Sequence, residues 1–152
     1  MQTSDPQTKL HVLFLCTGNS CRSQMAEGLT NALFGGEWQA VSAGTQPSGY
    51  VHPLAVQALK EIGINHQGFS KSVEQFRGTP FDLVITLCDD ADQNCPVWLG
   101  KGKRQHIGFP DPAEVQGSDA EKIAAFRGVR DDIKARVFPA LTSFVTVQHK
   151  SD

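Results

Sequence analysis

The sequence predicts an α/β fold in which helices cover both faces of a parallel sheet. Short apolar runs rich in β-branched residues alternate along the chain with segments whose apolar residues recur at helical spacing. This order is typical of parallel sheets, because each strand needs a crossover connection, usually a helix, before the next parallel strand. Ligands bind such sheets at the carboxyl ends of the strands, so polar residues that follow a strand are candidates for a functional site.

The first strand is predicted at residues 12–15, a run of four apolar side chains. The polar run Thr-Gly-Asn-Ser at residues 17–20 predicts a tight turn, in which Gly18 is free to adopt a positive φ and Asn19 tolerates one. Residues 24–29 then open a helix, which we expect to end at Gly35 and Gly36.

A second strand is predicted at residues 38–43, and it ends at Gly44. Pro53 is suited to begin the next helix and Gly63 to stop it. The apolar residues of this segment fall on one helical face. They are Leu54, Ala55, Ala58, Leu59 and Ile62.

The strongest strand pattern is the β-branched run at residues 81–87, which predicts a buried strand, and residues 105–109 form a weaker candidate. Residues 118–144 carry a long helical pattern, in which Pro139 predicts a kink or a break. Cys16 and Cys88 each follow a predicted strand directly, so we expect both at the same edge of the sheet.

Length and composition predict one domain at residues 10–148, with residues 1–9 as a polar extension, because no linker or internal repeat divides the 152 residues. The net charge is −2 with Lys and Arg scattered, which argues against nucleic-acid and membrane-surface partners and favours a small ligand. No segment resembles a signal peptide or a membrane span, so we expect a cytoplasmic protein. In that compartment, four cysteines are more often catalytic, redox-active or metal-binding than structural.

Cys16 is the candidate nucleophile, because it lies between the predicted strand and helix on a loop that also carries Arg22. In a strand-loop-helix unit, backbone N–H groups and the positive end of the helix dipole point at one place, and anions bind there. The same groups favour a thiolate over a thiol. The alternative is a buried structural Cys16 with an exposed Arg22.

Cys88 and Cys95 form a second pair, in a segment whose abrupt change to polar residues predicts a surface position with reachable thiols. If this segment were helical, the two Cα atoms would lie about 10 Å apart, beyond the roughly 7 Å at which a disulfide closes. Oxidation would then have to unwind the segment, which makes it a candidate redox switch. Two alternatives are a chance Cys95, or zinc bound by all four thiols, although their spacings do not match zinc knuckles.

Asp111, in a loop behind the last predicted strand, is the candidate general acid. An acid that protonates a departing oxygen must lie near the anion without pairing with Arg22, and Pro110 and Pro112 stiffen its loop. The alternative is that Asp111 only forms a turn. The histidines and tryptophans have no predicted role beyond the surface or the core: His11, His52, His66, His106, His149, Trp38 and Trp98.

Three motifs, taken in order, resemble those of one known family. They are residues 16–28 (CTGNSCRSQMAEG), residues 84–88 (VITLC) with Cys95 and Pro96, and residues 111–113 (DPA). Together they are similar to the thioredoxin-coupled arsenate reductases, which share the low-molecular-weight tyrosine phosphatase fold. The resemblance extends from about Leu10 to the long last helix, and it implies a three-layer α/β/α fold with a four-stranded parallel sheet.

Carried over from that family, the resemblance implies a three-cysteine relay. Cys16 would attack arsenate, which the loop N–H groups and Arg22 hold, while Asp111 protonates the leaving oxygen. Cys88 would then attack the adduct, so that arsenite leaves and a Cys16–Cys88 disulfide remains. Cys95 would resolve that disulfide and present a Cys88–Cys95 disulfide to thioredoxin.

The resemblance also assigns the rest of the loop. Ser23 would hydrogen-bond the Cys16 thiolate, and Asn19 with Ser42 would hold the loop in its strained shape, whereas Cys21 has no role in the relay. Potassium-binding members carry an Asp in the loop after the second helix, where this chain has Ser72. No metal or other cofactor is therefore expected, although the nearby Glu74 leaves potassium open. The implied oxyanion loop is Thr17, Gly18, Asn19, Ser20, Cys21, Arg22 and Ser23.

Two other functions stay open. A low-molecular-weight tyrosine phosphatase needs only the nucleophile, the arginine and the acid, but such enzymes carry Pro where this chain has Gln24 and tyrosines where it has Ala113 and Glu114. Tyr50 is the only tyrosine. A non-enzymatic oxyanion or arsenite sensor is the third hypothesis, although no basic face supports it. The intact second cysteine pair favours thioredoxin over glutaredoxin or a small thiol as reductant, and we expect a monomer.

Overall fold

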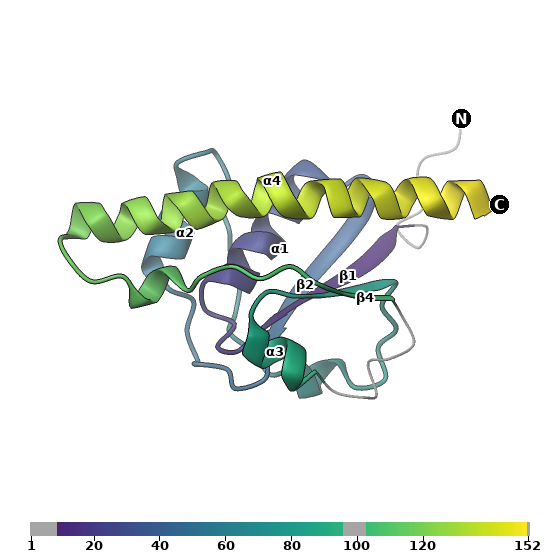
Figure 1. The fold of residues 1–152 in the computed structure, drawn as a ribbon, viewed down its shortest axis with the longest axis horizontal. Coiled ribbons are helices and arrows are strands. Elements are labelled where there is room, and N and C mark those ends of the chain that lie inside the picture. Colours follow the sequence, from purple (N-terminus) through teal and green to yellow (C-terminus); the bar gives the residue numbers. More distant parts are fainter. Residues whose placement is uncertain (1–8, 96–102, 152) are drawn as a thin grey trace.

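A four-stranded parallel sheet forms the centre of the molecule, in the computed structural model, which describes residues 9–95 and 103–151 (Figure 1). The strands are β1 (Leu10–Cys16), β2 (Trp38–Gly44), β3 (Leu83–Thr86) and β4 (Lys103–His106). They lie in the order β2-β1-β3-β4, and every pair of neighbours is parallel. The predicted α/β architecture with a four-stranded parallel sheet is therefore confirmed.

In the described part of the chain, four α-helices connect and cover the strands. They are α1 (Arg22–Leu33), α2 (Pro53–Lys60), α3 (Asp89–Gln93) and α4 (Asp119–Ser151), with two short 3₁₀ turns, η2 (Val73–Phe76) and η4 (Pro112–Glu114). The start of α2 follows from local chemistry, because Pro53 stands at its first position and the His52 ring accepts the N–H of Leu54. In Figure 1, α4 runs across the whole length of the molecule, in front of α1 and α2.

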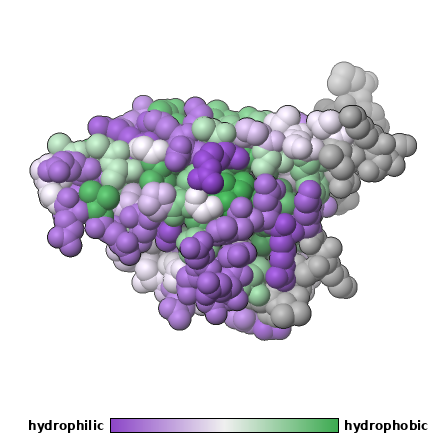
Figure 2. Space-filling view, viewed as in Figure 1, coloured by the Kyte–Doolittle hydropathy of each residue, from purple (hydrophilic) through white to green (hydrophobic). Residues whose placement is uncertain are grey.

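The inner strands β1 and β3 are buried on both faces. Residues 12–16 of β1 and all four residues of β3 are inaccessible or nearly so, which explains why both sequences are apolar without alternation. Strand β4 differs, because its four residues are all exposed at the edge of the sheet. Figure 2 shows hydrophilic side chains gathered over α3 and the chain around it.

Two predicted strands are shorter or displaced in the structure. The run at residues 81–87 forms a strand only over Leu83–Thr86, and the strand predicted at residues 105–109 lies instead at Lys103–His106. After His106 the chain still donates hydrogen bonds beside β3, from Ile107 N to Thr86 O and from Phe109 N to Leu87 O. It leaves the ladder there because Gly108 and Pro110 flank Phe109, and Pro has no N–H to continue it.

Two helix details also differ from expectation. Helix α2 ends at Lys60, so Ile62 lies in the following turn rather than on the buried face, and it is 40% exposed. Helix α4 does not break at Pro139, because its apolar stripe continues on both sides of that residue and packs on the core. None of the helices in the described part of the chain combines the length and the apolar character needed to cross a membrane.

The topology brings the candidate residues to one edge. Cys16 is the last residue of β1, Cys88 follows β3 by two positions, and Asp111 follows β4 in the loop that leads to η4. Because the strands are parallel, these three chain segments meet at the carboxyl edge of the sheet. The prediction that Cys16 and Cys88 share this edge is confirmed.

The buried face of α2 can be tested with two neighbouring residues. We expect Leu59→Ala, at a fully buried side chain, to lower the free energy of unfolding by about 2–5 kcal/mol. Ile62→Ala, at the half-exposed position beyond the helix, should cost less than about 1 kcal/mol. Urea denaturation of both variants measures the difference, and equal costs would contradict the observed end of α2.

Candidate active site

The loop after β1 presents its amide groups to one point. Its carbonyl groups all accept hydrogen bonds from outside the loop: Thr45 N to Cys16 O, Gln46 N to Thr17 O, Ser48 N to Gly18 O, Gln24 Nε2 to Asn19 O and His52 N to Ser20 O. Among the described residues, the N–H groups of residues 18–21 donate to no protein acceptor. A loop whose carbonyls face outward and whose N–H groups are free is suited to bind an oxyanion, next to the N-terminus of α1.

Asn19 holds the loop in this conformation. Its φ of 49° is the only positive value at a non-glycine residue in the described chain, and its side chain is completely buried. The Oδ1 atom accepts from Lys71 N at 2.9 Å and from Gln24 Nε2 at 3.1 Å. Beside it, a Cβ on Gly44 would lie 2.5 Å from Thr17 O, so only glycine allows β2 to approach the loop this closely.

A hydrogen-bond relay ends at the sulfur of Cys16. Asn19 Nδ2 donates to Ser23 Oγ at 2.8 Å, and Ser23 Oγ lies 2.9 Å from Cys16 Sγ. Because the amide nitrogen can only donate, Ser23 accepts there and its own proton is left for the Cys16 sulfur. The Ser23 hydroxyl is therefore placed to donate to the Cys16 sulfur, which is buried with 2% of its surface exposed.

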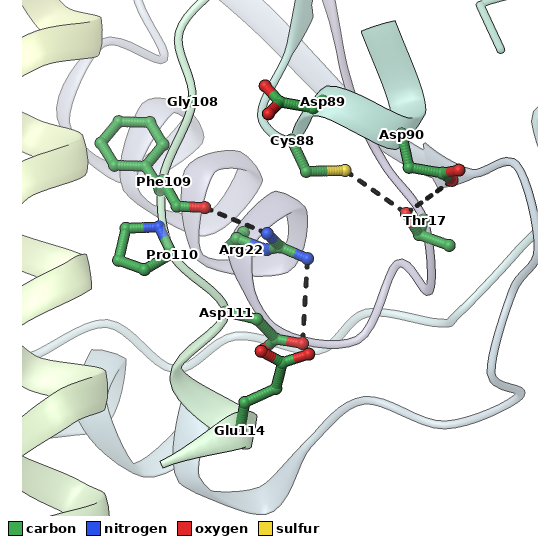
Figure 3. A pocket seen from close by; sticks show the side chains of 10 residues that line it. All are labelled: Thr17, Arg22, Cys88, Asp89, Asp90, Gly108, Phe109, Pro110, Asp111 and Glu114. Carbon is green, nitrogen blue, oxygen red and sulfur yellow. Dashed lines mark hydrogen bonds and ion pairs between the residues drawn. The ribbon is translucent and has the colours of Figure 1, made fainter. Parts of the chain in front are cut away.

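Arg22 and Asp111 face one another across a pocket of about 600 Å³ (Figure 3). Arg22 donates to Phe109 O at 3.0 Å, and its second terminal nitrogen lies 3.9 Å from Asp111 Oδ2. The expectation that the acid does not pair with Arg22 is therefore wrong, although the pair is long. Asp111 Oδ1 accepts the N–H of Ala113 and caps η4, so the residue forms the turn and also directs its other oxygen toward the pocket.

Cys88 lies at the opposite side of the same pocket. Its sulfur is 3.3 Å from Thr17 Oγ1 and accepts the N–H of Ala91, which makes Cys88 the N-cap of α3. This position leaves only 9% of the residue exposed, so the prediction of a readily reachable thiol is wrong for Cys88. The physical reason is that the cap turns the sulfur inward, toward Thr17, rather than toward solvent.

The other two thiols are held in their neutral forms. Burial raises the pKa of Cys21 to about 12, with the charge of Asp111 adding to the effect, so Cys21 is not a nucleophile. Burial also raises the pKa of Cys95, which lies just beyond α3 and is partly exposed. All four cysteines are free, as a site with consecutive thiol steps requires.

Polar side chains outside the loop hydrogen-bond to it and support its conformation. Gln24 is one of them, and the sequence analysis did not assign it this role. Gln24 is fully buried, donates to Phe69 O at 2.8 Å and lies 2.7 Å from His66 Nε2. The signal for it was present, because helical spacing puts Gln24 on the same buried face as Gly28, whose Cβ would meet Leu59 and His66. Burial lowers the pKa of His66 and so favours the neutral ring beside Gln24. The charge of Glu27 opposes this effect.

Ser42 reaches the loop only through other residues. Its hydroxyl donates to Glu27 Oε1 at 2.7 Å, and Lys71 Nζ lies 3.7 Å from the same oxygen. The backbone N–H of Lys71 in turn holds Asn19. The Lys71 ammonium thus lies beside Glu27. Within the described ranges, no cluster of three or more His, Cys, Asp or Glu side chains could hold a metal ion.

The described histidine and tryptophan residues that were predicted to have no role in the site contribute to packing and to contacts between elements. His106 Nδ1 lies 2.8 Å from Thr86 Oγ1 and its Nε2 3.1 Å from Asp89 Oδ1, so it links β4 to α3. Trp38 is buried against Phe144, whereas Trp98 and Pro96 lie outside the described residues.

Comparisons with known proteins agree with this geometry. The profile of the family described as low molecular weight phosphotyrosine protein phosphatase matches residues 11–150. An arsenate reductase of Halalkalibacterium halodurans is 49% identical over 127 residues, which are 83% of this chain and 91% of that protein. A solved arsenate reductase in its oxidized state is 32% identical with a TM-score of 0.74, over 88% of this chain and 98% of that one. The thioredoxin-dependent arsenate reductase of Corynebacterium glutamicum is 26% identical with a TM-score of 0.69, over 91% and 63%.

The relay to Cys16 is tested by removing its last hydroxyl. We expect Ser23→Ala to slow iodoacetamide alkylation of Cys16 at pH 7 about tenfold, because the thiolate loses a charge-assisted hydrogen bond. Peptide-resolved mass spectrometry measures the rate at each cysteine. Ser72→Ala is the matched control, since that hydroxyl only caps η2. An unchanged rate in Ser23→Ala would show that this hydroxyl does not stabilise the thiolate.

Proposed function

The chain belongs to the low molecular weight phosphotyrosine protein phosphatase family, and we propose that it is an arsenate reductase whose thiols Cys16, Cys88 and Cys95 act in turn. The single observation that carries this proposal is the pocket in which the Cys16 loop, Arg22 and a second thiol meet. A phosphatase needs the first two of these, whereas only a reductase needs a second thiol next to the adduct. The enzyme would serve arsenic detoxification.

In the first step, the oxyanion binds in the loop and Cys16 attacks arsenic. The free N–H groups of the loop, the N-terminus of α1 and the Arg22 guanidinium compensate the negative charge of arsenate. Asp111 protonates the departing oxygen, which leaves as water. The long 3.9 Å separation between Arg22 and Asp111 supports this role, because a tightly paired carboxylate would be a poor acid.

In the second step, the Cys88 sulfur attacks the Cys16 sulfur. The Cys16–Cys88 bond forms, the Cys16–arsenic bond breaks, and its electron pair remains on arsenic, which is reduced from arsenate to arsenite. Thr17, whose hydroxyl lies 3.3 Å from the Cys88 sulfur, directly follows Cys16 in the chain. Thr17, the residue after Cys16, and Cys88 line one pocket, which supports direct attack.

In the third step, Cys95 attacks Cys88 and frees Cys16. Helix α3 contains only five residues and buries only Ala91, so little apolar burial opposes its unwinding. The partial burial that raises the pKa of Cys95 delays this step until the segment opens. The resulting Cys88–Cys95 disulfide would lie in the segment around α3, where Figure 2 shows a hydrophilic surface and an external dithiol can approach.

The proposed reductant is thioredoxin, which regenerates the three thiols. The support is the intact resolving pair Cys88 and Cys95, together with the thioredoxin dependence stated for the Corynebacterium glutamicum relative. Four free thiols suit a reducing compartment, so we place the enzyme in the cytoplasm. The protein would act as a monomer, because nothing in the sequence pattern requires a partner subunit.

A tyrosine phosphatase is the second candidate, since the family and the oxyanion loop are shared. The structure offers little to hold an aryl ring: Phe109 is the only aromatic residue that lines the pocket within the described chain, and Tyr50 lies elsewhere. Gln24, at the position where such phosphatases carry Pro, is committed to the support of the loop.

The relay is tested by counting turnovers. With arsenate, thioredoxin, thioredoxin reductase and NADPH, we expect the wild type to turn over many times and Cys95→Ser to stop near one turnover per enzyme, because Cys16 stays in a disulfide with Cys88. Arsenite formed per enzyme counts the turnovers, and NADPH oxidation follows only those turnovers whose disulfide thioredoxin has reduced. Cys21→Ser is the matched control and should still turn over repeatedly, since that buried thiol takes no part in the relay.

The same variants separate the two candidate functions. If the wild type consumed no NADPH but hydrolysed an aryl phosphate, with loss of hydrolysis in Cys16→Ser and not in Cys88→Ser, the protein would be a phosphatase. Repeated turnover by Cys95→Ser would contradict the role given to the third thiol.

A further inference from the structure

The histidine at the end of β4 joins the edge of the sheet to the helix that separates the second and third thiols. His106 Nδ1 lies 2.8 Å from Thr86 Oγ1, and its Nε2 lies 3.1 Å from Asp89 Oδ1. The same Thr86 hydroxyl donates to Asp92 Oδ1 at 3.3 Å. Asp89 and Asp92 are three residues apart on α3 and share one face, so these contacts fix that face to the sheet.

The two contacts of His106 form whether or not its ring is charged. A carboxylate can only accept hydrogen bonds, so the Nε2 atom that faces Asp89 carries a proton. In a charged ring, Nδ1 donates to the Thr86 oxygen. In a neutral ring, Nδ1 accepts the Thr86 proton, which then turns away from Asp92. The bridge from Thr86 through His106 to Asp89 is therefore complete in both charge states.

Helix α3 depends on such contacts, because little apolar surface holds it. Only Ala91 of its five residues is buried, and so short a helix is not stable by itself in water. Asp90 accepts from Thr17 Oγ1 at 2.9 Å, and Figure 3 shows Asp89 and Asp90 leaving the helix in different directions. Polar contacts thus hold α3 to the Cys16 loop through Asp90 and to the sheet through Asp89.

A folded α3 keeps the second and third sulfurs apart. Cys88 is the N-cap of the helix and its sulfur accepts the N–H of Ala91, whereas Cys95 follows the C-cap Asn94. Seven residues at the rise of a helix span about 10 Å, and a disulfide needs Cα atoms within about 7 Å of one another. The helix must therefore open before these sulfurs bond, and contacts that fix it to the sheet oppose the opening.

We infer that His106 is a positioning residue for the last thiol step: through Asp89 it holds α3 folded, and so it shifts the equilibrium between the Cys88–Cys95 disulfide and the two thiols toward the thiols. This inference rests on the proposed function, in which that disulfide forms. The contact exists while α3 is folded, so it stabilises the dithiol form and not the disulfide form. A contact that stabilised both forms equally would leave the equilibrium unchanged.

The proposed relay explains why such a contact is useful. In the second step the Cys88 sulfur has to lie at the pocket, which is where the folded helix places it. In the third step the helix has to open, and the finished disulfide then has to be reduced from outside. A helix that regains its contact with His106 on reduction makes the disulfide easier to reduce, because refolding favours the thiols.

The test is the equilibrium constant of this disulfide in the full-length protein with Cys16→Ser, in which Cys88 and Cys95 are the exchanging pair beside α3. The protein is equilibrated at neutral pH with mixtures of reduced and oxidised glutathione. When the Cys88–Cys95 bond forms, the two thiols lose two protons and two electrons, and one glutathione disulfide becomes two glutathione thiols. Acid quenching, alkylation of the remaining thiols and mass spectrometry of the peptides measure the disulfide fraction.

We expect His106→Leu to raise the equilibrium constant for disulfide formation about fivefold, as for the loss of one hydrogen bond of ordinary strength. Gln105→Leu is the matched control, because Gln105 is also exposed on β4 but its side chain points to the opposite face of the sheet. The control should change the constant by less than about twofold, as is usual for surface substitutions.

Two further variants test the route through Asp89. Asp89→Ala removes the partner at a side chain that is 90% exposed, and it should shift the constant in the same direction as His106→Leu. In the Asp89→Ala background, His106→Leu should have no further effect, because the contact through which it acts is gone.

The outcomes separate this inference from the relay itself. A constant that His106→Leu leaves unchanged, or an undiminished effect of His106→Leu without Asp89, would overturn the inference and leave the relay intact. If no Cys88–Cys95 disulfide formed in any variant, the inference would fall together with the third step. Failure of the proposed function would instead appear as absence of arsenate turnover, while the glutathione equilibrium still responded to His106→Leu.

Discussion

The outward bonding of the loop carbonyls is the constraint on which the rest of the site depends. A loop of consecutive amides can bind an anion only if its N–H groups converge, and here the segments at residues 44–52 and 69–71 hold the carbonyls away from the pocket. Asn19 adopts a positive φ for this purpose. Three hydrogen bonds made by its buried side chain compensate the backbone strain. The same side chain sets the direction of the Ser23 proton, so loop shape and nucleophile are linked through one residue.

The cysteines differ by their surroundings rather than by their chemistry. Cys16 receives a proton donor in Ser23, Cys88 shares the Thr17 hydroxyl with Asp90, and Cys95 is kept neutral by burial. An ordered relay needs such differences, because thiols with equal thiolate populations would compete for the same step. In the proposed relay, the hydrogen-bond partners and the burial of each sulfur would set the order in which the thiols react.

Rigid and labile parts of the molecule lie side by side. Strands β1 and β3 are buried on both faces and fix the ends from which the loop and Cys88 emerge. Helix α3, directly after β3, buries only Ala91 and is held mainly by polar contacts from Thr17 and His106. A redox switch needs this combination, because the first sulfur must stay in place while the segment that carries the last one rearranges.

The sequence by itself determined the fold class, the loop and the edge of the sheet where Cys16, Cys88 and Asp111 meet, because these follow from local periodicity and from the rule that parallel strands end together. It did not determine the true position of β4, the exposure of Ile62, the burial of Cys88 or the pairing of Asp111 with Arg22. Only the tertiary structure decided which partner Thr17, Gln24 and Ser42 would have, since each hydrogen bond joins residues remote in sequence. Periodicity records which face of an element is buried, whereas the direction of a single proton depends on atoms that only the folded chain brings together.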